Sequence, residues 1–307
     1  MNILVTGGAG FIGSHITDAL IKEGHHVIIV DNLSTGLKRH VNKDSRFYEM
    51  DILDDALGDV IAKERIDAIF HTAGHILVRD SVKDPVKDAT INIIGGIKLL
   101  EHARRHRVRR VIYSSTGGAI YGEPKRNPCT ENDAPDAISP YGVSKYALER
   151  YMRLYQHLHN VDGVILRYSN VYGPRQGVEG EAGVISIFAK RMLLGQDCTI
   201  FGSGEQTRDF IHVSDVVEAN LQALRKTVIG HNVLNISTNV GTSINRIHEL
   251  LAASFGVTTR ARHGPSVEGE VMHSVLDNTL AKQKLSWQPH TQIEQGIKET
   301  AQWFKTT

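Results

Sequence analysis

Tyr141 and Lys145 are the side chains of this sequence best suited to moving a proton. They stand in the run SPYGVSK, residues 139–145, and on a helix this spacing places both on one face. A phenol with a pKa of about 10 is a poor base at neutral pH. A nearby ammonium group, or the positive charge of an oxidised nicotinamide, favours the phenolate. We therefore expect Tyr141 to act as general base and acid, with Lys145 as its electrostatic partner.

A run of hydroxyl side chains, Ser114-Ser115-Thr116, lies upstream of this pair. It follows the apolar residues 111–113, which predict a strand that opens into the hydroxyl run. A hydroxyl group there can steady a substrate oxygen while the phenol exchanges a proton. Thr116 and Ser115 are both candidates for this catalytic role. The competing reading, a surface Tyr–Lys pair on an ordinary helix, is disfavoured once these hydroxyls and the glycine run below are considered together.

The first residues of the chain predict a dinucleotide site. Residues 3–5 form a short apolar strand, and Gly7, Gly10 and Gly13 follow before an amphipathic run. Glycine allows a tight turn, a close approach of backbone to a pyrophosphate, and close packing of helix on sheet. The N–H groups at the start of the helix then face the phosphates.

A second apolar strand, residues 27–30, ends in Asp31. An acidic residue at this distance takes the hydroxyls of the adenosine ribose, and its charge would repel a 2′-phosphate. The expected cofactor is therefore NAD rather than NADP. The polar loop 32–36 suits the adenosine end, and Asp51, which follows a third strand, is expected beside the adenine.

Strands at 3–5, 27–30, 47–50, 66–71 and 111–113 alternate with helical segments, of which 88–105 is one. This alternation predicts an α/β fold with a right-handed, doubly wound parallel (Rossmann) sheet, whose ligands lie beyond the carboxyl ends of the strands. Beyond residue 175 the periodicity breaks. We expect an NAD-binding domain at 1–171, with a later contribution from about 208–240, and a smaller C-terminal substrate-binding lobe at 172–207 and 241–307.

Bulk properties narrow the class of protein. The formal net charge of the 307 residues is +1, so nothing points to nucleic acid or a membrane surface. Cys129 and Cys198 lie far apart, and we predict no metal site. No apolar stretch approaches the roughly 20 residues of a membrane span, and the N-terminal strand leaves no room for a signal peptide. We expect a cytoplasmic enzyme.

These motifs resemble the extended short-chain dehydrogenase/reductase family, and within it the NAD-dependent nucleotide-sugar 4-epimerases. The matching segments are residues 1–13, 31–36, 114–122, 139–145, 167–175 and 202–215. The resemblance implies a UDP-sugar substrate, Tyr141 as the base, Asn170 as a contact to the sugar nucleotide and Asn92 beside the cofactor. His75 stands where the family usually has a neutral amide, and we expect it near the nicotinamide, with an ordinary loop histidine as the alternative.

The residues expected to contact the cofactor follow the strand ends. They are Gly7, Gly10, Phe11, Ile12, Gly13, Asp31, Asn32, Ser34, Thr35, Gly36, Asp51, Ile52, Ala73, Gly74, His75, Asn92, Ser114, Tyr141, Lys145 and Tyr168. The residues expected to contact the substrate are Thr116, Tyr141, Asn170, Gly183, Val184, Thr199, Phe201, Gln206, Arg208 and Ser274.

The loop after Thr116 separates subfamilies. Related 4,6-dehydratases carry an Asp-Glu pair there and related decarboxylases a nearby Glu, whereas this chain has Gly117 and Gly118. That difference favours chemistry with one proton-transfer residue and a reversible hydride step. Counted back from Tyr121, Thr116 lies one residue further than the family's usual catalytic hydroxyl, which keeps Ser115 as the alternative.

The substrate lobe departs from the family at one arginine. Arg208 matches the arginine that binds the diphosphate, a task suited to guanidinium geometry. The next family arginine is replaced by Val267, and Arg260 or Arg262 is a possible substitute. Ser274, five residues after Gly269, stands where a tyrosine is associated with epimerases restricted to plain hexoses. The resemblance therefore implies room for an N-acetylated sugar.

Three functions remain open. The first is reversible 4-epimerisation of a UDP-hexose, UDP-glucose and UDP-galactose or their N-acetylated forms, with tightly held NAD. The second is a one-way NAD-dependent reductase or dehydrogenase on a related sugar nucleotide such as a UDP-uronate, and the third is a non-catalytic NAD-binding protein. A second apolar stripe on each of the helices 88–105 and 141–158, the latter through Ala147, Tyr151, Leu154 and Leu158, predicts a homodimer through a four-helix bundle.

Overall fold

A large parallel sheet forms the centre of the computed structural model, which describes residues 1–177, 183–228, 232–258, 261–266 and 271–306. Its strand order is β10-β6-β5-β4-β1-β2-β3, and every neighbouring pair is parallel. The strands are β1 (Asn2–Thr6), β2 (His26–Asp31), β3 (Arg46–Glu49), β4 (Ala68–His71), β5 (Arg110–Thr116), β6 (Asp162–Tyr168) and β10 (Val233–Ile236). Most are short apolar runs, which suits strands that are covered on both faces.

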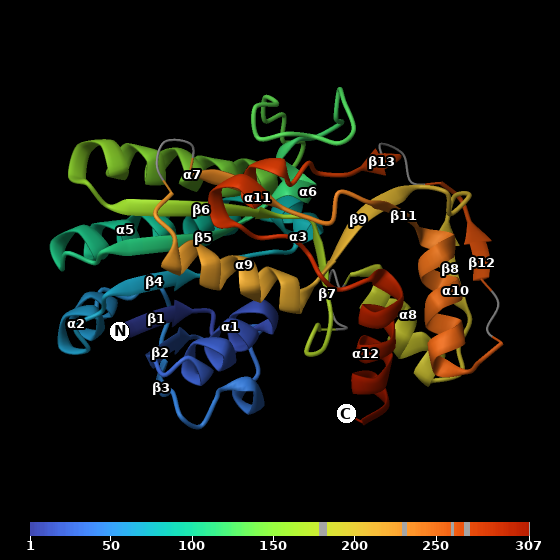
Figure 1. Cartoon of the computed structure of the whole chain (residues 1–307), viewed down its shortest axis with the longest axis horizontal. Helices are drawn as coiled ribbons and strands as arrows, with labels where there is room; N and C mark the ends of the chain where they lie inside the picture. The colour runs from blue at the N-terminus through green and yellow to red at the C-terminus, as the bar shows by residue number, and fades with distance from the viewer. Residues whose placement is uncertain (178–182, 229–231, 259–260, 267–270, 307) are drawn as a thin grey trace.

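Helices cover both faces of this sheet, so the predicted doubly wound α/β fold is confirmed. One face packs against α1 (Phe11–Lys22), α9 (Val213–Arg225) and α11 (Thr279–Leu285). The other packs against α2 (Leu57–Lys63), α5 (Gly95–Arg105) and α7 (Pro140–His159). Figure 1 shows the sheet with its helices on the left and the smaller lobe on the right.

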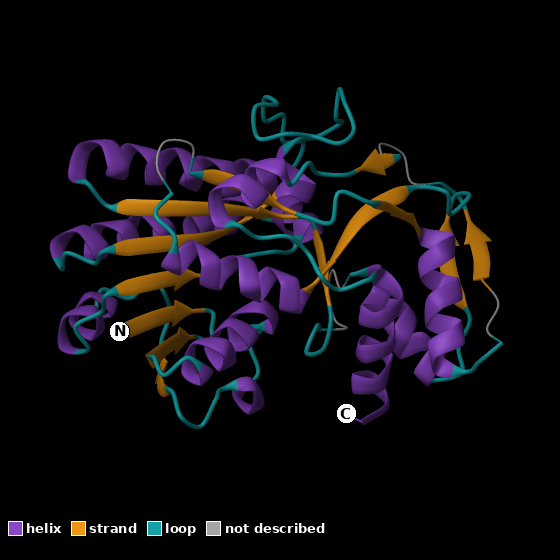
Figure 2. Cartoon of the chain, in the orientation of Figure 1, coloured by secondary structure: helices purple, strands orange, loops and turns teal. Residues whose placement is uncertain are grey.

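The smaller lobe combines short sheets with helices that pack against them (Figure 2). In the first sheet β9 (Thr207–His212) lies between β11 (Gly241–Ser243) and β13 (His273–Ser274) and also pairs with β7 (Asn170–Tyr172). The second pairs β8 (Cys198–Phe201) with β12 (Ala261–Gly264). The helices α8 (Val184–Leu193), α10 (Ile244–Phe255) and α12 (Ile293–Thr306) pack into one apolar cluster with these sheets.

Short helical segments connect the main elements. They are η1 (Lys38–His40), α3 (Val78–Lys83), α4 (Pro85–Ala89), the π-helical turn η2 (Thr90–Ile94) and α6 (Gly117–Ile120). In the part of the chain that the structure describes, no helix is both long and apolar enough to cross a membrane.

Some elements differ from those predicted. The hydroxyl run 114–116 is the end of β5 and not the start of a loop, because pairing with β6 continues to Thr116. The predicted helix 88–105 is α4, η2 and α5 in succession. Helix α11 packs on the large sheet through Ala281 and Leu285, although its residues fall in the range that we assigned to the smaller lobe. The division into lobes stays a prediction.

Candidate active site

A cavity of about 900 Å³ lies at the carboxyl ends of the large-sheet strands and is lined by residues of both lobes. It brings together every residue that we expected to contact the substrate: Thr116, Tyr141, Asn170, Gly183, Val184, Thr199, Phe201, Gln206, Arg208 and Ser274. These side chains come from segments far apart in the sequence, so the fold gathers them. Their individual roles stay predictions.

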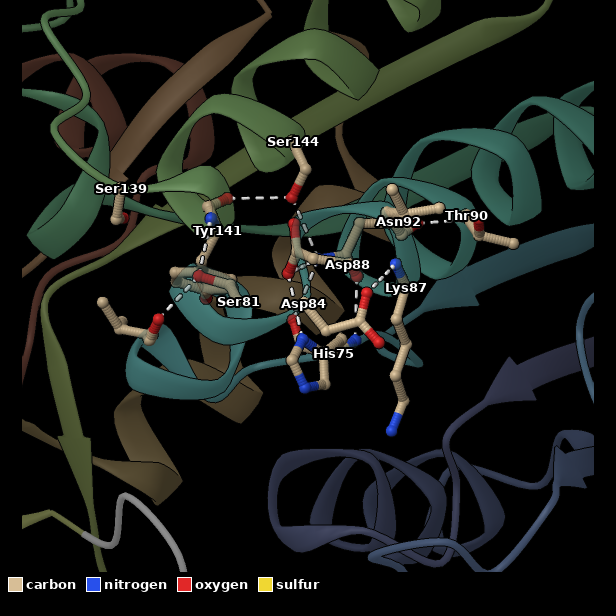
Figure 3. Close-up of polar contacts among 12 residues, drawn as sticks. His75, Ser81, Asp84, Lys87, Asp88, Thr90, Asn92, Ser139, Tyr141 and Ser144 are labelled. Atoms are coloured by element: carbon tan, nitrogen blue, oxygen red, sulfur yellow. Dashed lines mark hydrogen bonds and ion pairs between the residues drawn. The ribbon is translucent and has the colours of Figure 1, made fainter.

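Tyr141 is placed by the first turn of α7. Ser139 caps this helix by accepting a hydrogen bond from the N–H of Gly142 at 3.2 Å, as serine commonly does at an N-cap. The backbone N–H of Tyr141 donates to the Ser81 hydroxyl at 3.1 Å, a contact drawn in Figure 3. The start of α7 is therefore tied to α3 beside the cavity.

The environment of Tyr141 favours its protonated form. Burial raises the pKa of this phenol to about 12, although a hydrogen bond with Thr116 lowers it, and the charge of Asp88 raises it further. We expected Lys145 to favour the phenolate, but Lys145 is not among the groups that shift this pKa. In the protein by itself Tyr141 is thus a proton donor at neutral pH, and a positive charge beside it is needed before it acts as a base.

The two candidate hydroxyls occupy different surroundings. Thr116 lines the cavity and hydrogen-bonds to Tyr141. Ser115 also lines the cavity, but its hydroxyl donates to the buried carboxylate of Glu149 at 2.5 Å. Neighbouring residues of a strand point to opposite faces, which explains why the two hydroxyls bind different partners. The geometry favours Thr116 over Ser115 as the hydroxyl that meets the substrate.

Lys145 is buried, with 4% of its surface exposed, and its ammonium nitrogen lies 4.5 Å from the centre of the Tyr113 ring. Burial lowers the pKa of Lys145 to about 8, while the negative charges of Glu149 and Asp88 limit that fall. The ammonium form is retained near neutral pH because two carboxylates and an aromatic face surround it.

A polar network connects the loop after β4 with α7 (Figure 3). The side-chain oxygen of Asn92 accepts from the N–H of His75 at 2.8 Å, and its amide nitrogen donates to the His75 carbonyl at 2.9 Å and to the Ser144 hydroxyl at 3.0 Å. The ring Nδ1 of His75 lies 3.0 Å from the carboxylate of Asp88. The π-helical turn η2 brings Asn92 into this position, and the network fixes the loop that we expect beside the nicotinamide.

The glycine turn between β1 and α1 fits a dinucleotide. Gly7 has a φ of +73°, and a Cβ there would lie 2.7 Å from the backbone nitrogen of Ala73. A Cβ on Gly13 would lie 2.2 Å from the carbonyl oxygen of Gly7. Gly10 caps α1 without a side-chain hydrogen bond, and the first turn holds no acidic residue. This helix terminus is therefore open to an anion such as a pyrophosphate. Phe11 and Ile12, the first two residues of α1, line the cavity.

Hydrogen bonds also hold the loops at the predicted adenosine end of the site. Asp31 ends β2, and its carboxylate accepts from the N–H groups of Ala9 at 2.9 Å and Leu33 at 2.8 Å. Asn32 donates to Asp51 at 2.7 Å, which joins the loops after β2 and β3. The other residues expected here, Ser34, Thr35 and Gly36, lie in the loop after β2. These residues fit NAD, and the contact of Asp31 with the ribose hydroxyls stays a prediction.

Three residues predicted to contact the cofactor, Ile52, Ser114 and Tyr168, have side chains that pack in the core or hydrogen-bond within the protein. Ile52 is 6% exposed and belongs to the apolar core under α5. The hydroxyl of Ser114 lies 3.0 Å from that of Tyr168, which in turn receives a hydrogen bond from Asn220. Of this pair, Tyr168 reaches the cavity wall.

The cavity is also lined by two arginines that the sequence analysis did not identify. Arg79 of α3 and Arg191 of α8 line the cavity together with Arg208. Ser274 is paired in register with Arg208 across β13 and β9. The proposed substitute Arg262 lies 75% exposed at its side chain and binds Asp197, so it does not line the cavity. Val267, Arg260 and Gly269 lie outside the described residues.

Comparison with known proteins agrees with this geometry. Residues 3–237 match the model of the NAD dependent epimerase/dehydratase family. The chain belongs to this family. A UDP-glucose 4-epimerase of Thermotoga maritima, solved with UDP-glucose, is 46% identical with a TM-score of 0.96 and covers 100% of this chain and 99% of its own.

Two further structures extend the comparison. The UDP-glucose 4-epimerase of Thermus thermophilus, in complex with NAD, is 37% identical with a TM-score of 0.93, over 99% of both chains. A UDP-N-acetylglucosamine 4-epimerase of Methanobrevibacter ruminantium, in complex with UDP-N-acetylmuramic acid, is 33% identical with a TM-score of 0.94, over 99% of this chain and 98% of its own. The resemblance thus spans the smaller lobe as well as the large sheet.

Proposed function

We propose that this protein is an NAD-dependent isomerase that interconverts the C4 epimers of a UDP-hexose, UDP-glucose and UDP-galactose first of all. The observation that carries the proposal is the cavity in which Tyr141 and Thr116 meet the residues expected to bind a sugar nucleotide. The UDP-glucose and NAD held by the related structures support it.

The residues of the site divide the chemistry between them. Bound NAD supplies reversible acceptance of the C4 hydride, so that a 4-keto sugar can receive it back on either face. Tyr141 takes the proton of the 4-hydroxyl and later returns it to the same oxygen. Thr116 hydrogen-bonds to that oxygen, and Lys145 holds the ribose hydroxyls of the cofactor. Arg208 binds the diphosphate, which leaves the sugar room to turn over within the cavity.

The loop after Thr116 supports epimerisation over elimination. Gly118 faces the site, since a Cβ on it would lie 3.9 Å from the Thr116 hydroxyl and 4.0 Å from the side-chain oxygen of Asn170. A dehydratase needs an acid and a base near this point, and here glycine occupies it. One proton-transfer residue, Tyr141, suffices for a reaction that starts and ends with a 4-hydroxyl group.

Incubating the purified protein with UDP-glucose and no added NAD tests the function. We expect UDP-galactose, separated by anion-exchange chromatography, without accumulation of NADH absorbance. The NAD content of the protein is measured in parallel, and one equivalent is restored if it was lost. Stoichiometric NADH with an oxidised sugar would instead indicate a dehydrogenase. No turnover with bound NAD would indicate a non-catalytic binding protein.

We further propose a homodimer in a reducing, cytoplasmic compartment. Both cysteines are free and buried, which suits such a compartment. Among the residues of the predicted stripe on α7, Tyr151, Leu154 and Leu158 are 38%, 45% and 57% exposed, and Ile94 at the end of η2, directly before α5, is 50% exposed. Exposed apolar residues on two neighbouring helices favour a partner surface.

Sedimentation at micromolar concentration should show a species of twice the 34.0 kDa chain mass. Leu154→Glu should convert it to the monomer, because a charge would be buried without a partner. Leu194→Glu, at a comparably exposed leucine after α8, is the matched control and should leave the dimer intact. A wild-type monomer would refute the dimer.

A further inference from the structure

The backbone N–H of Tyr141 is one of the donors that the first turn of a helix leaves without an intrahelical partner. The residue before it, Pro140, is the first of α7 and carries no N–H. The cap residue Ser139 accepts from the N–H of Gly142 with its hydroxyl, at 3.2 Å, and from the N–H of Val143 with its carbonyl, at 3.0 Å. A group from outside the helix must therefore accept from Tyr141.

Ser81 of α3 supplies that group from 60 positions earlier in the sequence, and its oxygen lies 3.1 Å from the Tyr141 nitrogen. The side chain of Ser81 is fully buried, and its hydroxyl donates to the carbonyl of Val78 at 2.6 Å. A hydroxyl group has a single proton to donate. Because Val78 receives that proton, the oxygen of Ser81 is left to act as the acceptor for Tyr141.

The carbonyl of Tyr141 is also held by a hydroxyl (Figure 3). Ser144 donates to it at 3.0 Å and accepts from the side-chain amide of Asn92 at 3.0 Å. Ser81 and Asn92 both belong to the segment between β4 and α5, from which Ile76 lines the cavity. That one segment therefore holds both polar groups of the Tyr141 backbone, directly or through Ser144.

We propose that Ser81 is a positioning residue, which fixes the backbone of Tyr141 so that its phenol stays within reach of Thr116 and of the reacting oxygen. Because Ser81 is fully buried, it acts through the Tyr141 N–H and not on the substrate. The proposal rests on the proposed function for the proton transfer by Tyr141. It adds that the segment after β4 determines where the proton-transfer residue stands.

Ser81→Ala removes the acceptor and leaves the Tyr141 N–H unpaired, so the first turn of α7 is free to shift. We expect kcat to fall by about 10-fold, since a displacement of about 1 Å near the reacting atoms can cost on the order of 10²-fold. KM should change less than kcat, because the residues expected to bind the sugar nucleotide are unaltered. The Tyr141 amide, followed by hydrogen exchange, should exchange faster than in the wild type without any turnover being needed.

Ser81→Thr separates the hydroxyl from the stability of the fold. Threonine in a helix makes the same kind of bond to a carbonyl one turn back, so the acceptor for Tyr141 is kept. Its extra methyl group enters a fully buried position and lowers stability. We expect near wild-type kcat and slow exchange of the Tyr141 amide in spite of a lower Tm.

The matched control is Ser254→Ala, which removes a helical serine hydroxyl that donates to the carbonyl of Leu250 at 2.8 Å in α10. It should leave both kcat and the exchange of the Tyr141 amide unchanged. If Ser81→Thr does not fold, the comparison of Ser81→Ala with this control decides the matter.

The proposal is overturned if Ser81→Ala keeps the wild-type kcat or the slow amide exchange, or if Ser81→Thr loses as much kcat as Ser81→Ala. A wild type without epimerase activity would remove the proposed function, while the amide exchange would still decide whether Ser81 holds the Tyr141 backbone.

Discussion

Tyr141→Phe should lower kcat by about 10²–10⁴-fold while the affinities for NAD and UDP-glucose change little. Phenylalanine keeps the ring at the start of α7 and removes only the hydroxyl that hydrogen-bonds to Thr116. The proton of the 4-hydroxyl then has no acceptor, whereas the glycine turn and the arginines of the cavity are untouched. Steady-state kinetics and titration calorimetry with both ligands check the two halves of this prediction.

Tyr155→Phe is the matched control for this experiment. Tyr155 lies on the same helix, and its hydroxyl donates to Glu101 at 2.7 Å, away from the cavity. It should retain near wild-type kcat at a small cost in stability. If Tyr141→Phe kept more than about a tenth of the wild-type activity, the proton-transfer role of Tyr141 would be wrong.

Local spacing explains what the sequence could predict. The interval between Tyr141 and Lys145 is a property of one helix, and the intervals among Gly7, Gly10 and Gly13 are properties of one turn. The parallel sheet followed from strands that alternate with helices, and it placed Asp31 and Thr116 at a common edge. Each of these inferences needed only neighbouring residues and general rules of packing.

The remaining features depend on contacts between distant segments. The geometry favours Thr116 over Ser115 because Glu149, which belongs to another element, accepts a hydrogen bond from Ser115. The sequence shows that Glu149 lies one helical turn after Lys145. It does not show that Arg167 on β6 donates hydrogen bonds to the Glu149 carboxylate. The raised pKa of Tyr141 reflects burial, which no pattern of residues around it reveals. Arg79 reaches the cavity through the short helix α3, whose position no local pattern defined.

The cavity beside Ser274 provides the prediction with the second largest expected effect. Ser274 lines the cavity on β13, in register with Arg208 on β9, so it lies beside the residue expected to bind the diphosphate. Its hydroxymethyl side chain leaves space that a tyrosine would fill. An acetamido group in place of the 2-hydroxyl adds a carbonyl and a methyl group, which this space can hold.

We therefore expect the wild type to turn over UDP-N-acetylglucosamine as well as UDP-glucose. Ser274→Tyr should lower kcat/KM for the N-acetylated sugar relative to UDP-glucose by about 10–200-fold, because a pocket that excludes a small group discriminates by that order. Ser274→Ala, which keeps the space and loses only the hydroxyl, should preserve the ratio. Rejection of the N-acetylated sugar by the wild type would contradict the prediction, as would a ratio that Ser274→Tyr leaves unchanged.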